Sequence, residues 1–172
     1  NHTGDEEYNW FLTVLFPAAE LNVLAYNRVI KDLNGQTFEE VAARLREIGE
    51  LTATETPVPP SPGSFCLFLN RAWYRLTLPA DSIDQEDPIG SLDVALLEQR
   101  VLGPIFGIGD VRTDSRIDFV GGIRGTGALE DRVNSGQWSC GVSMYPTSVE
   151  QLMAVSDAGE VMPPKSTWFE PK

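Results

Sequence analysis

The sequence predicts an α+β fold in which about four helices pack on a mixed, largely antiparallel sheet. Three observations predict it. Stretches rich in aromatic and β-branched residues outnumber the stretches with helical spacing of apolar residues. The two kinds of stretch do not alternate strictly, as they do in parallel α/β folds. Two capping-box patterns, at Thr37 and Thr147, mark the starts of helices inside an otherwise strand-rich chain.

Strands are expected where aromatic and β-branched residues run together and a turn residue ends the run. Pro17 ends the first of these runs, and Asn70-Arg71 forms the turn of a hairpin. A hairpin needs a larger sheet to join, and the first two strands supply one. The expected strands are Tyr8–Phe16, Leu21–Ile30, Phe65–Leu69, Trp73–Leu78, Ile117–Val120, Trp138–Tyr145 and a short strand at the end of the tail near Phe169.

Helices are expected after capping residues. Thr37-Phe38-Glu39-Glu40 is a capping box, apolar residues follow it at helical spacing up to Ile48, and Gly49 ends the helix. Ser91 is expected to cap a second helix that runs to Leu102 and is buried nearly all round. Two further helices are expected over Ala128–Val133 and from the second capping box to Ala158.

The net charge excludes several classes of partner. The chain has 172 residues and a formal net charge of −12. An extended nucleic-acid surface and a polybasic membrane surface both need a basic face, so neither is expected. A small anion site built from a few arginines, lysines and backbone N–H groups remains compatible with this charge.

Length and cysteine content indicate one cytoplasmic domain. The chain is long enough to bury a core of its own, and we expect a single α+β domain over residues 1–172 that is the C-terminal fragment of a longer protein lacking its N-terminal half. Cys66 and Cys140 lie far apart in apolar runs, which is typical of buried thiols in a reducing compartment. Two cysteines and His2 do not make a zinc site. The oligomeric state cannot be predicted.

A glycine-rich turn is the first candidate binding site. Gly121 and Gly122 begin a run of four glycines in seven residues, between a predicted strand and a predicted helix. Backbone N–H groups in such a turn can hold a phosphate. Arg116 and Arg124 flank the turn, and Asp114 and Asp118 could bind a metal ion or pair with these arginines. The alternative is a tight turn that needs glycine only for its backbone.

Two short strings are further candidates. Lys165-Ser166-Thr167 follows a rigid Pro-Pro and contains the single cation between Arg132 and Lys172, so it could hold an anion. Tyr26-Asn27-Arg28, at the second strand, combines an aromatic ring, an amide and a guanidinium that can orient a small polar ligand. The alternatives are a solvent-exposed lysine in a turn and a surface ion pair at a strand end.

These strings together resemble a bacterial and archaeal family of unknown function, DUF1015. The resemblance covers essentially the whole chain and is carried by strings of residues in four regions. They are Tyr26-Asn27-Arg28-Val29 with Lys31-Asp32-Leu33; Leu92-Asp93-Val94; Asp114 and Arg116 with Asp118-Phe119-Val120-Gly121-Gly122; and Pro146-Thr147, Asp157 and Gly159 with Met162-Pro163-Pro164-Lys165-Ser166-Thr167, Phe169, Pro171 and Lys172.

The resemblance implies a function that residue patterns alone do not. It implies a distant relation to ParB-like and sulfiredoxin-like nucleotide-binding proteins, and some members resemble ATP-dependent kinases of free L-serine. Such kinases need ATP and Mg²⁺. The family's N-terminal half carries an acidic-Gly-His-His-Arg motif that this chain lacks. We therefore expect the chain alone to be inactive, with its own N-terminal domain as partner.

Under this hypothesis the candidate residues face one cleft. Phosphates or the substrate carboxylate are expected to contact Tyr26, Asn27, Arg28, Arg116, Gly121, Gly122, Arg124, Lys165, Ser166 and Thr167, with Asp114 and Asp118 as candidate Mg²⁺ ligands. No catalytic residue is identified. The alternative is a non-catalytic domain that binds a nucleotide or metabolite, or that serves as a scaffold.

Overall fold

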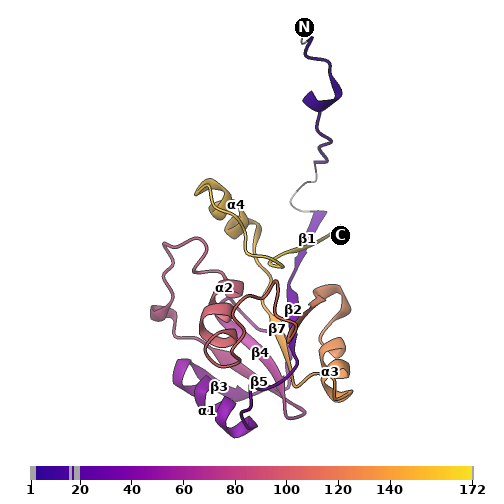
Figure 1. Cartoon of the computed structure of the whole chain (residues 1–172). Coiled ribbons are helices and arrows are strands. Elements are labelled where there is room, and N and C mark those ends of the chain that lie inside the picture. Colours follow the sequence, from indigo (N-terminus) through magenta and orange to yellow (C-terminus); the bar gives the residue numbers. More distant parts are fainter. Residues whose placement is uncertain (1–2, 16, 18–19, 172) are drawn as a thin grey trace.

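A six-stranded antiparallel sheet runs through the body of the computed structural model, which describes residues 3–15, 17 and 20–171 (Figure 1). In spatial order its strands are β3 (Glu50–Ala53), β5 (Ala72–Thr77), β4 (Ser64–Leu69), β7 (Cys140–Met144), β2 (Tyr26–Ile30) and β6 (Ile117–Gly121). A second, two-stranded antiparallel sheet pairs β1 (Leu21–Leu24) with β8 (Trp168–Pro171). These sheets and the helices confirm the predicted α+β fold.

Helices cover both faces of the large sheet. Within the described residues the α-helices are α1 (Phe38–Ile48), α2 (Asp93–Leu97), α3 (Gly127–Asn134) and α4 (Val149–Asp157), and a π-helical turn over Glu98–Leu102 extends α2. The larger core joins alternate residues of β4, such as Phe65 and Leu67, to side chains of α1 and α2. The smaller core lies on the other face, where Leu129 of α3 packs with Cys66 and Phe68.

The capping box at Thr37 and the turn at Asn70-Arg71 predicted α1 and the β4–β5 hairpin correctly. The Thr37 hydroxyl accepts a hydrogen bond from the N–H of Glu40, and the Glu40 carboxylate accepts one from the N–H of Thr37, so the predicted capping box is present. Asn70 and Arg71 turn the hairpin with φ angles of 49° and 62°, the left-handed conformation that a two-residue turn requires. The strand β3 was not predicted, since its exposed residues carry no apolar pattern.

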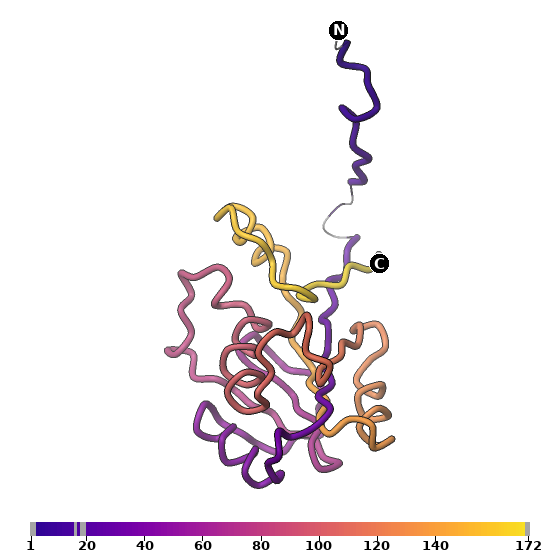
Figure 2. Tube along the Cα trace, viewed as in Figure 1, coloured from indigo at the N-terminus to yellow at the C-terminus, as the bar shows by residue number. Residues whose placement is uncertain are grey.

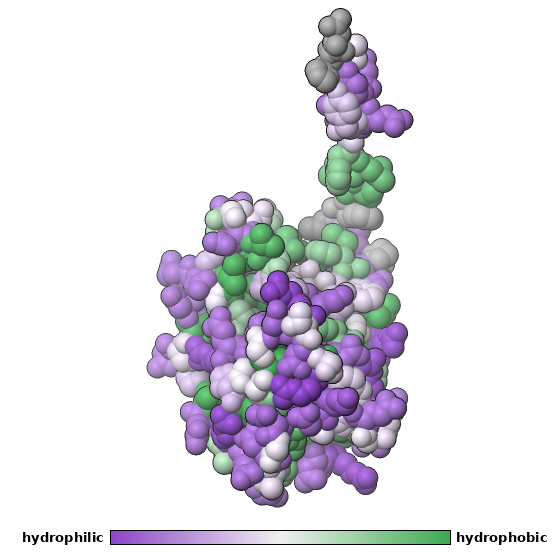
Figure 3. Space-filling model, in the orientation of Figure 1, coloured by the Kyte–Doolittle hydropathy of each residue, from purple (hydrophilic) through white to green (hydrophobic). Residues whose placement is uncertain are grey.

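The prediction of a strand over Tyr8–Phe16 is wrong for residues 8–15, and Phe16 lies outside the described residues. A short 3-10 turn occupies Glu7–Asn9 and an irregular extended segment follows it. Residues 3–15, here called the arm, project from the body, and their apolar side chains are exposed (Figures 2 and 3). Aromatic and β-branched residues favour a strand only where another strand offers backbone partners, and none lies beside the arm in the described structure.

Three element boundaries also differ from the predictions. The expected strand Leu21–Ile30 divides at Ala25 into β1 and β2, because its halves pair with different strands. α2 begins at Asp93 with Leu92 at its N-cap position, one residue after the expected capping residue Ser91. The capping box of α4 is formed by Ser148 and Gln151, one residue later than expected. The Thr147 hydroxyl instead donates to the Ser166 carbonyl, 3.2 Å away.

Candidate functional site

The antiparallel pair β2–β6 brings two of the predicted strings together. Tyr26, at the start of β2, lies opposite Gly121, at the end of β6. The chain then makes a 3-10 turn over Gly122–Arg124 before α3 begins at Gly127. The glycine-rich turn therefore connects a strand to a helix, as the sequence predicted, and lies beside Tyr26.

A pocket of about 280 Å³ opens at this edge of the sheet. We call it the cationic pocket, and its lining residues are Tyr26, Asp118, Phe119, Gly121, Arg124, Arg132, Lys165 and Trp168. Arg124 and Lys165 are exposed and have no ion pair within the described residues. Arg132, from α3, pairs with Asp118. Three cations and one carboxylate leave the pocket with a positive charge that suits an anion.

Lys165 is held at the pocket by its backbone and by an aromatic ring. Its φ of 55° is left-handed, a conformation that L-residues adopt rarely and that a surrounding structure must impose. Its Nζ atom lies 5.2 Å from the centroid of the Tyr26 ring, within range of a cation–π contact. The Tyr26 ring itself packs edge-on against Trp168 at 5.4 Å. The lysine therefore has a defined position rather than that of a free surface side chain.

Arg28 lies directly beneath this arrangement and is 3% exposed. Its guanidinium donates to the carbonyl oxygen of Tyr26 and, over 3.3 Å, to that of Lys165, and it lies 5.5 Å from the centroid of the Phe119 ring. Burial lowers the pKa of Arg28 to about 10, although the negative charge of Glu98 opposes this shift. Arg28 does not line the cationic pocket, so it positions Lys165 instead of contacting a ligand there.

The first two glycines of the turn are required by close packing. A Cβ atom on Gly121 would lie 2.8 Å from the Trp168 ring, and one on Gly122 would lie 2.6 Å from the Ala25 carbonyl oxygen. Real Cβ atoms do not approach other heavy atoms so closely. These contacts hold the turn against β1, β2 and β8, and so fix the walls of the pocket.

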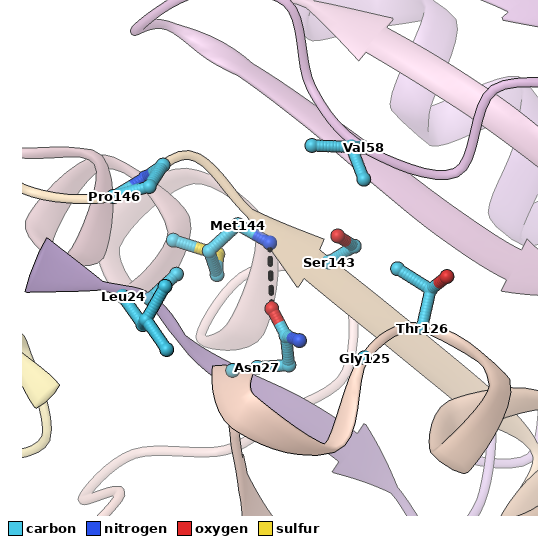
Figure 4. A pocket seen from close by; sticks show the side chains of 10 residues that line it. Leu24, Asn27, Val58, Gly125, Thr126, Ser143, Met144 and Pro146 are labelled. Atoms are coloured by element: carbon cyan, nitrogen blue, oxygen red, sulfur yellow. Dashed lines mark hydrogen bonds between the residues drawn. The ribbon is translucent and has the colours of Figure 1, made fainter. Parts of the chain in front are cut away.

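A second pocket of about 310 Å³ lies at the other side of the same turn (Figure 4). We call it the apolar pocket, and its lining residues are Leu24, Ala25, Asn27, Val58, Gly122, Gly125, Thr126, Ser143, Met144 and Pro146. Asn27 is buried here and accepts a hydrogen bond from the N–H of Met144, 3.0 Å away. The predicted candidates thus divide between two pockets instead of facing one cleft.

Besides Arg28, four predicted candidates line neither pocket: Asp114, Arg116, Ser166 and Thr167. Arg116 pairs with Asp114 at 2.9 Å and donates to the carbonyls of Phe106 and Gly107, so it fixes a loop. Ser166 is buried and Thr167 is half-buried, and neither lines either pocket. Of the predicted residues, the structure therefore brings Tyr26, Asp118, Gly121, Arg124 and Lys165 to the cationic pocket, and Asn27 and Gly122 to the apolar pocket.

The two candidate metal ligands are engaged with arginines. The hydrogen bond from Arg116 lowers the pKa of Asp114. For Asp118, burial acts to raise the pKa, but the bonds from Arg132 and from the Phe119 backbone lower it overall. Among the described residues no three His, Cys, Asp or Glu side chains gather as a metal site. The residues present therefore do not fit a Mg²⁺ ion by themselves, and no chemical step is assigned to one.

Sequence reasoning missed Arg132 and Ser143. Arg132 reaches the cationic pocket because α3 packs on β7, β2 and β4, and its side chain pairs with Asp118 of β6. The signal available in the sequence was an arginine on a helix that could pair with an aspartate in the preceding strand. Ser143 faces the apolar pocket from β7, and nothing in its local sequence marks it.

Comparison with known proteins identifies the family. The family model described as "Protein of unknown function (DUF1015)" matches residues 1–95, which include β2 and the start of α2. No curated protein matches the chain. Within the described residues, no helix is long and apolar enough to cross a membrane.

The comparison with solved structures finds one with the same fold and a second, weaker likeness. A glutamine-for-glutamate mutant of a free serine kinase in complex with AMP is similar over 88% of this chain, with a TM-score of 0.52 and 15% sequence identity. A conserved hypothetical protein from Pyrococcus furiosus has a TM-score of 0.48 and 14% identity over the same share. The similar region is 55% of the kinase chain and 57% of the other, so this chain spans about half their length. By its match to the family model, the chain belongs to the DUF1015 family of proteins of unknown function.

Proposed function

We propose that this chain is the C-terminal part of an ATP-dependent kinase that phosphorylates free L-serine, and that the cationic pocket binds phosphate groups or the serine carboxylate. One observation carries the proposal. In a chain with a net charge of −12, Arg124, Arg132 and Lys165 converge on one small pocket, and buried Arg28 lies beneath it. The kinase fold found in comparison supports the reaction class.

The chemistry of the pocket suits an anion with several oxygens. Guanidinium groups bind phosphate and carboxylate through two parallel N–H donors, and an ammonium acts as a compact positive charge. Arg124 and Lys165 face the pocket without carboxylate partners in the described structure. Phosphoryl transfer depends mainly on positioning and on stabilising charge, which is what these groups supply.

The remaining parts of the reaction are assigned to the rest of the protein. Asp118 is the one carboxylate in the cationic pocket and is paired with Arg132, so it is not placed to take a proton from the serine hydroxyl. The arm supports a second domain, because its apolar side chains need a surface to cover them. The relation to ParB-like and sulfiredoxin-like proteins, the use of Mg²⁺ and the cytoplasmic location stay predictions.

A non-catalytic nucleotide- or metabolite-binding role is the second candidate. The observation that favours it is that the one carboxylate lining the cationic pocket, Asp118, is paired with Arg132, and no histidine lines the pocket. Binding without turnover, even in the longer protein, distinguishes this role from that of a kinase.

Calorimetric titration of the chain with ATP and with inorganic pyrophosphate tests the site. We expect Lys165→Ala and Arg124→Ala each to weaken binding by about tenfold. Arg46→Ala is the matched control, because it removes an exposed arginine on α1. Wild-type affinity in both pocket variants contradicts the assignment of the site. In the longer protein, serine-dependent ATP turnover reduced by Lys165→Ala supports the kinase, and binding with no turnover contradicts it.

A further inference from the structure

The apolar pocket contains two buried polar side chains with unused hydrogen-bonding groups. Asn27 is 4% exposed and Ser143 is 2% exposed. The Asn27 amide oxygen accepts from the N–H of Met144, and within the described residues neither the Asn27 NH₂ group nor the Ser143 hydroxyl forms a side-chain hydrogen bond of its own, so both groups are open to the pocket. Buried polar groups are almost always paired. Both residues line the pocket, and Figure 4 shows the Asn27 amide between Met144 and Gly125.

The rest of the pocket limits the chemistry of its ligand. No charged side chain lines it, and Leu24, Met144 and Pro146 supply apolar walls. A phosphate, a carboxylate or the ammonium group of an amino acid would be buried there without a counter-charge, which is strongly unfavourable. A neutral flat molecule with hydrogen-bond acceptors at its edge pairs with the Asn27 NH₂ and buries its faces on the walls.

We propose that the apolar pocket binds the nucleobase of the nucleotide whose phosphates occupy the cationic pocket. This inference rests on the proposed function, since it extends the same site. The volume of the apolar pocket, about 310 Å³, lies in the range of small-molecule binding pockets. The Thr126 hydroxyl adds a third polar group, because it makes no capping bond at the start of α3.

The glycine turn joins the two pockets. Gly122 and Gly125 line the apolar pocket, whereas Gly121 and Arg124 line the cationic pocket. A nucleotide with its base in one pocket and its phosphates in the other crosses this turn. At Gly125 there is open space where a side chain would begin, since an added Cβ atom meets nothing within 4 Å. The turn thus lies between the uncharged apolar pocket and the cationic pocket and lines both of them.

Nuclear magnetic resonance titration of the isotope-labelled chain tests this division. Adenosine, which has the base without phosphate, is expected to shift the Asn27 side-chain NH₂ signals and the Gly125 amide. Inorganic pyrophosphate is expected to shift the Gly121 and Arg124 amides instead. Thr126→Phe narrows the apolar pocket without removing a capping bond, and we expect it to weaken adenosine binding by at least about tenfold with pyrophosphate binding unchanged.

Matched variants separate the possible failures. Thr52→Phe places the same ring on an exposed position of β3 and should bind adenosine as the wild type does. Ser143→Ala removes one hydroxyl and is expected to weaken adenosine by about threefold, so it tests the pocket if Thr126→Phe does not fold. Wild-type adenosine affinity in Thr126→Phe and Ser143→Ala, or no adenosine binding to the wild type, overturns the inference. If the wild type does not bind pyrophosphate, the proposed function is overturned instead.

Discussion

The guanidinium of Arg28 donates a hydrogen bond to the backbone carbonyl of Lys165, 137 positions away in the sequence. This bond links β2, the strand next to the edge strand β6, to the segment before β8, and it helps hold Lys165 in its left-handed conformation. Since the Lys165 side chain faces the cationic pocket, a buried arginine controls where an exposed lysine presents its charge.

Replacing Arg28 should therefore weaken anion binding without touching the anion. Arg28→Met keeps most of the side-chain volume but leaves the carbonyls of Tyr26 and Lys165 without their donor. We expect pyrophosphate affinity to fall by about tenfold and the free energy of unfolding to fall by about 2 kcal/mol. Calorimetry well below the melting temperature separates the two effects. Unchanged affinity in a folded variant contradicts the positioning role, whereas Arg28→Lys should recover part of the affinity.

Asp93 should make stability depend on pH. Burial raises the pKa of Asp93 to about 6, although the N–H of Gly63 donates to its Oδ1 atom at 2.7 Å and opposes the shift. Its Oδ2 atom is buried without a partner. The folded state thus holds this proton up to a higher pH than the unfolded state does. Stability should fall as pH rises from about 4 to about 6, by about 2 to 3 kcal/mol, and stay level above that range.

Denaturation midpoints measured between pH 4 and pH 8 check this prediction. Asp93→Asn keeps an oxygen for Gly63 and carries no charge, so its stability should not show the fall and should exceed that of the wild type at pH 7. Asp81→Asn is the control, because Asp81 is exposed. A wild-type curve that rises through this range, or identical curves for wild type and Asp93→Asn, contradicts the raised pKa.

Sequence patterns that span a few neighbouring residues predicted helix starts and turns correctly. They did not predict which distant segments pair as strands. The capping box at Thr37 and the turn at Asn70 depend on neighbours within a few positions, so their sequence patterns were sufficient. Tyr8–Leu15 has the composition of a strand, but a strand also needs a partner that no local pattern supplies. This is why the prediction of a strand failed there.

The difference between local patterns and long-range packing also explains which arginines reach the cationic pocket. Arg116 and Arg124 flank the glycine turn equally well in the sequence. Arg116 turns back to Asp114 and the loop carbonyls, whereas Arg124 lines the pocket, and Arg132 joins it from α3. Which arginine reaches a site depends on how the next helix packs, and that packing is set by buried contacts such as Leu129 against Phe68.

Gly121→Ala should test whether the turn is glycine-rich for packing. The added Cβ would meet the Trp168 ring at 2.8 Å and displace it, at a cost of about 1 to 3 kcal/mol. Trp168 fluorescence and thermal unfolding should both change. Gly127→Ala is the matched control, because a Cβ there meets nothing within 4 Å and alanine favours the helix that begins at this residue. Equal stability of Gly121→Ala and wild type would contradict a packing role.

The arm should govern self-association rather than the stability of the body. None of residues 3–15 is buried, and Phe11, Leu12 and Leu15 are 93%, 87% and 88% exposed. Replacing these three residues by serine should change the free energy of unfolding by less than about 0.5 kcal/mol. Contiguous exposed apolar side chains promote association, so sedimentation at high protein concentration should show less oligomer than for the wild type. Val161→Ser, at an exposed site outside the arm, should leave sedimentation unchanged. A large loss of stability on replacing the three arm residues would mean that the arm packs on the body of its own chain.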